Sequence, residues 1–327
     1  MLKKALLFGF LLLSTSSLFA SSALTYYREN GLANLEKQLD LQLTQTQYWT
    51  NHVHTVDTRF GYIEEYSSIL TCSKDDATLS IYTKGEDNEY VLNKTHNAYT
   101  GKNSGDKTRE GDRKTPVGIY TLTEKLSKET KLDPFYGPLA FVTSYPNIYD
   151  NYLGKNGHGI WIHGLPIKRS RDKFTKGCIA IKNSNIECIG KKIDIEKTLL
   201  IINSHKVNQD ISKLTLASIL AELYKWRYTW LYSDIDGYLS FYASDFVRSD
   251  GVNFENFKRY KTRVFKKDEK KSIIFRNINV IPYPNRENIY QITFKEFYKS
   301  QSFEFIGNKT LMVRVDSNGK IKIFTEK

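Results

Sequence analysis

Short runs of alternating apolar and polar residues follow one another between Tyr66 and His205, separated by clusters of Gly, Asp, Asn and Lys. Alternation with a period of two is typical of β-strands that bury one face. We therefore expect a compact, mixed β-rich domain over residues 65–205. Its strands are predicted at residues 68–72, 78–82, 89–93, 117–123, 139–142, 160–164, 178–181 and 199–202.

Apolar residues at helical spacing flank this domain on both sides. Before it, evenly spaced leucines predict a helix over about residues 23–49, which would pack on the β-rich domain or pair with a second copy to form a homodimer. After it, a second α+β unit is predicted over residues 206–327, so that the whole chain belongs to the α+β class. Its elements are helices at 214–233 and 236–246, then antiparallel strands at 272–280, 289–300, 310–315 and 320–324.

The first twenty residues combine a basic start, an apolar stretch and small residues that end at Ala20. Lys3 and Lys4 precede the apolar stretch 5–13, which is shorter than the roughly 20 residues that span a membrane. This is the pattern of a cleaved secretory signal peptide over residues 1–20. The sequence therefore predicts export to the periplasm, an N-terminal helical segment over residues 21–64, and no integral membrane span.

The chain has 48 Lys and Arg against 36 Asp and Glu, a formal net charge of +12. In a cytoplasmic protein this balance would indicate nucleic acid. Because an exported chain seldom meets nucleic acid, we expect none as a partner and favour carboxylate-rich peptides of the cell wall. A generally basic soluble surface accounts for most of these lysines equally well.

Three cysteines occur, at positions 72, 178 and 188. An odd count in an oxidising compartment leaves at least one thiol outside any disulfide, and Cys178 is the candidate. Whether Cys72 and Cys188 pair depends on a distance that the sequence does not give.

Two of the predicted strands place a histidine and a cysteine on related faces. In an extended chain, Ile160 and Ile162 point to one side and Trp161 and His163 to the other. The second strand buries Ile179 and Ile181 in the same way, which leaves Cys178 on the opposite face. If the two strands are neighbours, His163 and Cys178 therefore share one face.

This pairing has the ingredients of a thiol nucleophile. A free Cys has a pKa of about 8.5 and needs a nearby imidazole or a positive field to become a thiolate. His163 would supply the imidazole, with His158 as a competing base. The backbone amides of Gly177 and Cys178 would stabilise an oxyanion. Positive charge comes from Lys168, Arg169, Arg171, Lys173 and Lys176. A buried structural cysteine is the alternative interpretation.

The same stretch resembles the YkuD-type L,D-transpeptidase family. Family members have an Ile-His-Gly strand end, then a Ser/Thr, His or Lys, Gly and Cys block, then an Asn. Two further similarities are a turn block at Gly111–Tyr120 and an overall extent of about residues 65–205. The matching positions are Ile162, His163, Gly164, Thr175, Lys176, Gly177, Cys178, Asn183, and Thr115, Pro116 and Gly118 in the turn block.

The resemblance implies a thiol enzyme that acts on peptidoglycan stem peptides. It implies Cys178 as nucleophile and His163 as base, with the imidazole held by the Gly164 carbonyl. Many members carry an Arg two residues after the Cys, where this chain has Ala180. We expect Arg169 or Arg171 to replace this anchor for a substrate carboxylate. Further substrate-binding candidates are Lys176, Trp161, His158 and a polar loop at residues 101–113.

The C-terminal unit resembles the NTF2-like fold, a cone with an apolar pocket, in which Lys309 and Glu326 are candidate pocket residues. Together the two resemblances indicate a peptidoglycan L,D-carboxypeptidase that trims tetrapeptide stems to tripeptides and affects cell shape. An L,D-transpeptidase that forms 3-3 cross-links is the first alternative. A non-catalytic wall-binding protein is the second. No metal cluster or phosphate-binding loop is recognisable, so we predict no metal and no cofactor.

Overall fold

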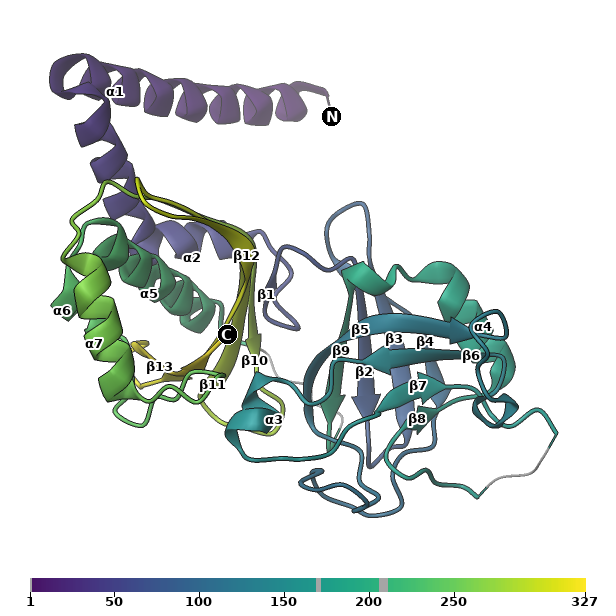
Figure 1. The fold of residues 1–327 in the computed structure, drawn as a ribbon. Coiled ribbons are helices and arrows are strands. Elements are labelled where there is room, and N and C mark those ends of the chain that lie inside the picture. Colours follow the sequence, from purple (N-terminus) through teal and green to yellow (C-terminus); the bar gives the residue numbers. More distant parts are fainter. Residues whose placement is uncertain (1, 169–171, 206–210) are drawn as a thin grey trace.

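The computed structural model describes residues 2–168, 172–205 and 211–327 and contains two β-sheets packed side by side (Figure 1). It confirms the α+β class. The first sheet has the strand order β4-β3-β2-β9-β5-β6-β7-β8. Its strands are β2 (Ser68–Ser73), β3 (Thr78–Lys84), β4 (Tyr90–Asn97), β5 (Gly118–Ser127), β6 (Leu139–Thr143), β7 (Trp161–His163), β8 (Ile179–Ala180) and β9 (Thr198–Asn203).

Each strand predicted between residues 65 and 205 is present in this sheet. The central strand β9 is buried on both faces, which explains its uninterrupted apolar sequence. Leu200 and Ile202 pack into the core of the first domain, whereas Leu199 and Ile201 face the second domain. Short helices complete the domain: η1 (Pro134–Tyr136), α3 (Ile148–Tyr152), α4 (Asn183–Lys192) and η2 (Ile195–Lys197).

The second sheet has the order β1-β10-β11-β12-β13 and forms one wall of a cone. Its strands are β1 (Tyr62–Ile63), β10 (Ser272–Pro282), β11 (Ile289–Lys299), β12 (Glu304–Val315) and β13 (Ile321–Glu326). Helices α5 (Lys213–Leu231), α6 (Ile235–Ser240) and α7 (Phe254–Phe265) lie on its inner face (Figure 1). The helix predicted over 236–246 therefore ends early, at Ser240, and α7 was not predicted.

The N-terminal helix differs from the prediction in its bounds and in its contacts. Helix α1 (Leu2–Leu43) breaks at Gly31, whose φ of 80° is unfavourable for residues with a side chain, and α2 (Thr46–His54) follows as a separate helix. Both pack against α5 rather than on the first domain. Homodimer formation through α1 stays a prediction. Among the described residues, no helix is both long and apolar enough to cross a membrane.

The N-terminal segment also contributes a strand to the second sheet. Tyr62 and Ile63 form β1, which pairs antiparallel with β10 before the chain enters the first sheet. The fully buried Asn279 fixes this crossing, because its Oδ1 accepts hydrogen bonds from the backbone N–H groups of Glu64 and Glu65, both at 3.2 Å. The second domain is thus built from both ends of the chain.

The two sheets share an apolar interface. The outer face of the second sheet contributes Met312 and Phe324, which pack with Ile119 and Leu199 of the first domain. The opposite faces of the same strands, such as Leu311 and Ile323, fill the cone. Alternation along single strands therefore divides the apolar residues between two cores.

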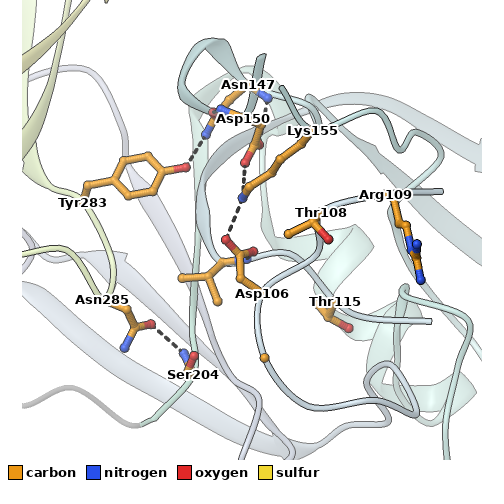
Figure 2. Close-up of polar contacts among 12 residues, drawn as sticks. Asp106, Thr108, Arg109, Thr115, Asn147, Asp150, Lys155, Ser204, Tyr283 and Asn285 are labelled. Atoms are coloured by element: carbon orange, nitrogen blue, oxygen red, sulfur yellow. Dashed lines mark hydrogen bonds and ion pairs between the residues drawn. The ribbon is translucent and has the colours of Figure 1, made fainter. Parts of the chain in front are cut away.

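A buried lysine joins the loop that carries Asp106 to helix α3 beside this interface (Figure 2). Lys155 Nζ lies 2.7 Å from Asp150 Oδ1 and 2.7 Å from Asp106 Oδ2, and the Lys155 and Asp150 side chains are 4% and 0% exposed. Burial raises the pKa of Asp150 although Lys155 opposes this shift. The network reaches the second domain through Asn147, whose Nδ2 donates to Tyr283 Oη at 3.0 Å.

We expect Lys155→Met to lower the free energy of unfolding by about 3–5 kcal/mol, because Asp150 would keep a buried charge with no partner cation. Without Lys155, the pKa of Asp150 would rise further. The loss of stability should be largest at neutral pH and shrink as the pH falls through that pKa, since protonation removes the charge of Asp150. Urea denaturation at several pH values measures both effects. The exposed Lys191→Met is the control. A loss below about 1 kcal/mol for Lys155→Met would contradict a buried ion pair.

Candidate active site

Strands β7 and β8 are parallel neighbours, as the sequence analysis required. Ile162 pairs with Ile179 and His163 with Ala180, so His163 lies on the face to which Cys178 also belongs. Ile160, Ile162, Ile179 and Ile181 are buried on the other face in the domain core. His163 is itself only 1% exposed, whereas Cys178 is half-buried at the start of β8.

The imidazole of His163 is oriented by a backbone carbonyl. Nδ1 lies 2.6 Å from the oxygen of Gly164. A carbonyl oxygen can only accept, so Nδ1 carries the proton and Nε2 of the neutral ring is the basic nitrogen. The ring of Tyr136 packs edge to face on His163, with 5.1 Å between centroids, and further limits rotation of the imidazole.

The Gly164 carbonyl is held in turn by a side chain at the start of α4. Asn183 Oδ1 accepts a hydrogen bond from the Leu165 N–H at 2.6 Å. The packing leaves no room for a larger residue, since a Cβ at Gly164 would lie 2.5 Å from that oxygen. Gly137, with a φ of 77°, closes the other side, where a Cβ would lie 2.8 Å from the Gly164 Cα. Asn183 is therefore a positioning residue for His163.

The hydroxyl of Thr175 shapes the turn before Cys178. Thr175 Oγ1 accepts from the Gly177 N–H at 2.9 Å and donates to the Cys178 carbonyl at 2.6 Å. Gly177 has a φ of 137°, and a Cβ there would lie 2.8 Å from the Lys114 carbonyl oxygen. Because Thr175 already engages the Gly177 N–H, the predicted oxyanion role rests more on the Cys178 N–H than on Gly177.

The polar loop at residues 101–113 lies next to this turn. Residues at its start pair with the cysteine segment: Lys102 N donates to the Thr175 carbonyl at 3.1 Å, and Thr175 N donates to the Thr100 carbonyl at 2.7 Å. Tyr99 and Ala180 exchange hydrogen bonds at 2.7 and 2.9 Å. A buried pair, Lys107 with Asp112 at 2.8 Å, holds the loop together, and these contacts lower the pKa of Asp112. The loop therefore borders the candidate site.

The other predicted substrate-binding residues are only partly placed by the structure. Trp161 is half-buried against Tyr136, with 4.9 Å between ring centroids. Lys176 and His158 are exposed, and His158 Nδ1 lies 4.0 Å from Glu110 Oε2. Arg169 and Arg171 lie outside the described residues. Ala180 is fully buried, so its position offers no contact to a substrate carboxylate.

Lys309 and Glu326, the predicted pocket residues, form an ion pair of the second domain. Lys309 Nζ lies 3.0 Å from Glu326 Oε1, and the Glu326 side chain is 3% exposed. Tyr242 donates to Glu326 Oε2 at 3.0 Å. Above this pair, Lys261 Nζ lies 4.7 Å from the centroid of the Trp230 ring, and burial lowers the pKa of Lys261 to about 8. The sequence analysis did not identify Lys261, because only the fold brings α7 to β13.

None of the three cysteines forms a disulfide among the described residues. Cys72 is buried and Cys188 is exposed, which excludes the pairing that the sequence left open. Burial raises the pKa of the Cys72 thiol to about 12, so that this thiol is inert at neutral pH.

Comparison with known proteins identifies both domains. Residues 67–202 match the L,D-transpeptidase catalytic domain, YkuD, and residues 218–327 match the Cds6 C-terminal NTF2-like domain. This chain therefore belongs to the L,D-transpeptidase family, in the form that carries a C-terminal NTF2-like domain.

The particular proteins that it is similar to include a solved structure that this chain covers almost completely. The helical cell shape determining protein Pgp2 from Campylobacter jejuni is 39% identical, with a TM-score of 0.78 over 87% of this chain and 99% of that chain. Bd1075 from Bdellovibrio bacteriovorus, 24% identical with a TM-score of 0.64 over 80% and 92% of the two chains, shares the fold. YafK from Escherichia coli, named as an L,D-transpeptidase, is 32% identical over 115 residues. That match covers 35% of this chain and only 42% of YafK.

Asn183→Ala tests the positioning of His163. Loss of the hydrogen bond to Leu165 would let the Gly164 carbonyl shift, and misplacement of a catalytic group by about 1 Å costs on the order of 100-fold. We expect kcat on a stem peptide to fall about 10- to 100-fold with little change in KM. Ser184→Ala, an exposed neighbour on α4, is the matched control. A change confined to KM would contradict the positioning role.

Alkylation with iodoacetamide tests the three thiol environments. In the native protein we expect Cys178 and Cys188 to be modified and Cys72 to stay unmodified until the protein is denatured, because Cys72 is buried with a raised pKa. Peptide mass spectrometry reports each position separately. Modification of Cys72 at the rate of Cys188 in the native protein would contradict the burial.

Proposed function

We propose that this chain is a peptidoglycan L,D-carboxypeptidase that removes the terminal D-Ala from tetrapeptide stems and leaves tripeptides. The observation that carries the proposal is the 2.6 Å contact from His163 Nδ1 to the Gly164 carbonyl, which directs the basic Nε2 away from the backbone on the face shared with Cys178. Membership of the L,D-transpeptidase family supports the reaction class. The likeness to Pgp2, named for helical cell shape, supports a role in cell shape.

In the first step, His163 Nε2 takes the proton of the Cys178 thiol, and the thiolate attacks the carbonyl carbon of the third stem residue, meso-diaminopimelate. Negative charge develops on the carbonyl oxygen and is stabilised by the Cys178 N–H. The tetrahedral intermediate then breaks its C–N bond. His163 returns the proton to the leaving amine, so that D-Ala departs and a thioester remains on Cys178.

In the second step, water attacks the thioester carbonyl while His163 Nε2 accepts a proton from that water. Collapse of the intermediate breaks the C–S bond, and Cys178 recovers a proton from His163. The tripeptide leaves with a new carboxylate. Throughout the cycle the proton stays on Nδ1 and is donated in a hydrogen bond to the Gly164 carbonyl, which keeps the imidazole in the orientation and tautomer that both steps use.

Basic residues of the neighbouring loops account for binding of an acidic stem peptide. Lys102 and Lys176 lie in the two segments that pair beside Cys178. We assign the carboxylate-binding role of the missing family Arg to this basic surface, together with Arg169 and Arg171. Positive charge there would favour the Cys178 thiolate as well.

The proposed place of action is the periplasm, after removal of residues 1–20. Two other functions remain as outcomes of the test below. An amine of a neighbouring stem could resolve the same thioester and yield a 3-3 cross-link, which would be L,D-transpeptidation. A wall-binding protein without catalysis would leave the stem unchanged.

We expect the purified protein to convert disaccharide tetrapeptide into disaccharide tripeptide, detected by mass spectrometry as loss of one alanine. Cys178→Ala should lower the rate by at least about 10³-fold, because no other group replaces the nucleophile. Cys188→Ala, which removes an exposed thiol on α4, is the matched control and should keep full activity.

The products separate the three functions. Cross-linked dimers in place of tripeptide would identify the protein as an L,D-transpeptidase. Tetrapeptide left unchanged by every protein would favour the non-catalytic wall-binding function. Equal activity of the Cys178→Ala protein would overturn the thiol mechanism.

A further inference from the structure

A polar cleft lies between the two domains, apart from His163 and Cys178. Its volume is about 380 Å³, within the range of about 300–1,000 Å³ that is typical of small-molecule sites. The second sheet contributes residues of β11 and β12, and the first domain contributes residues of β5 and the segment that follows β6. The residues used below are Gln291, Thr293, Asn308, Thr310, Tyr66 and Asn151.

The cleft opens where the outer face of the second sheet turns from apolar to polar. Along β12, Met312 belongs to the apolar interface, whereas Thr310 and Asn308 follow on the same face. On β11, Gln291 pairs with Met312 and Thr293 with Thr310, so these side chains share that face. A face that packed dry against the first domain would be apolar here. The sequence instead provides amides and hydroxyls.

Two of these polar side chains are more than nine-tenths buried and lack a partner. Gln291 and Tyr66 are each 8% exposed, and both line the cleft. Among the described residues, neither the Gln291 amide nor the Tyr66 hydroxyl has a hydrogen-bond partner, and the same holds for the side chains of Asn308 and Thr310. Among the described residues, the fully buried side-chain polar atoms without a partner are Tyr145 Oη and Trp226 Nε1, so the polar atoms of Gln291 and Tyr66 are open to the cleft. A ligand in the cleft can therefore replace water on groups that both donate and accept.

The charges in the cleft are largely compensated, which disfavours an ionic ligand. Glu65 Oε1 lies 3.7 Å from Lys197 Nζ, and Lys309 is paired with Glu326. Lys327 is the remaining charged residue of the lining and is exposed. Apolar groups, among them Ile119 and Leu199, form part of the floor. Amides and hydroxyls around an apolar floor match a neutral sugar, which presents hydroxyls at its rim and C–H groups on its faces.

We infer that this cleft binds the N-acetylated glycan of peptidoglycan, with room for about one or two sugar rings. The choice of glycan rests on the proposed action on peptidoglycan. Ser144, in the wall of the cleft, directly follows β6, and β6 pairs with the strand that carries His163. A glycan strand held in the cleft would thus be fixed to the same rigid sheet that presents the active site to the stem peptide.

The experiment measures binding of N,N′,N″,N‴-tetraacetylchitotetraose, an uncharged N-acetylglucosamine oligomer, to the full-length Cys178→Ala protein by calorimetry. We expect binding to this protein, and at least about tenfold weaker binding when Gln291→Met or Thr310→Val is added, because each removes hydrogen-bonding groups at nearly constant volume. Gln301→Met, at an exposed turn, is the matched control and should bind normally.

Thermal unfolding separates a ligand-binding role from a structural one. Gln291→Met should leave the Tm unchanged or raise it, because the amide makes no hydrogen bond to the described part of the protein. A lower Tm together with weaker binding would assign Gln291 to the fold and overturn the inference. Absence of chitotetraose binding to the Cys178→Ala protein, or equal binding by Gln291→Met and Thr310→Val, would overturn it as well.

Kinetics on two substrates keeps this inference apart from the proposed function. Gln291→Met should raise KM about tenfold for disaccharide tetrapeptide and leave KM unchanged for the free tetrapeptide, which carries no sugar. Equal effects on both substrates would overturn glycan binding in the cleft. If neither the unmodified protein nor Gln291→Met released D-Ala, the proposed carboxypeptidase activity would be wrong. Calorimetry would still test glycan binding in the cleft.

Discussion

The buried ammonium of Lys155 between Asp106 and Asp150 is the constraint on which the arrangement of this molecule depends. Its two ion pairs, both 2.7 Å long, connect the loop beside Gly177 to the segment around α3. Asn147 extends the connection to Tyr283 of the second domain. A charge removed from water is tolerated only where its partners are fixed. The loop that borders the cysteine is consequently held by Lys155, and the same network reaches the contact between the domains through Asp150 and Asn147.

The orientation of His163 likewise depends on a small number of groups. A carbonyl takes the place of a triad carboxylate beside His163, and it fixes the tautomer without adding a charge. Such a carbonyl works only if the backbone that bears it is rigid. Asn183 from α4 and the close approach of Gly137 supply that rigidity. In the proposed mechanism the chemistry belongs to His163 and Cys178, whereas the rigidity beside His163 comes from the two segments that carry Asn183 and Gly137.

The sequence predicted the parts of this structure that depend on local periodicity. The strands of the first sheet and the shared face of His163 and Cys178 followed from alternation, and α5 followed from helical spacing. Pairing between distant segments has no such local signal. Strand β1, which has two residues, was too short to recognise. The helix break at Gly31 and the contacts of α2 with α5 depend on packing. Gln291 lay within a predicted strand and Tyr283 between two of them, and only the fold shows that both lie between the domains.

The pairing of β1 with β10 has a consequence for the order in which the chain folds. Because α2 and β1 belong to the second domain, the first domain is inserted within it. In the proposed export to the periplasm the chain enters unfolded and N-terminus first, so the sheet that carries His163 and Cys178 is complete once β9 has entered. The other sheet waits for β13. The first domain would therefore mature between two ends of a second domain that is still incomplete.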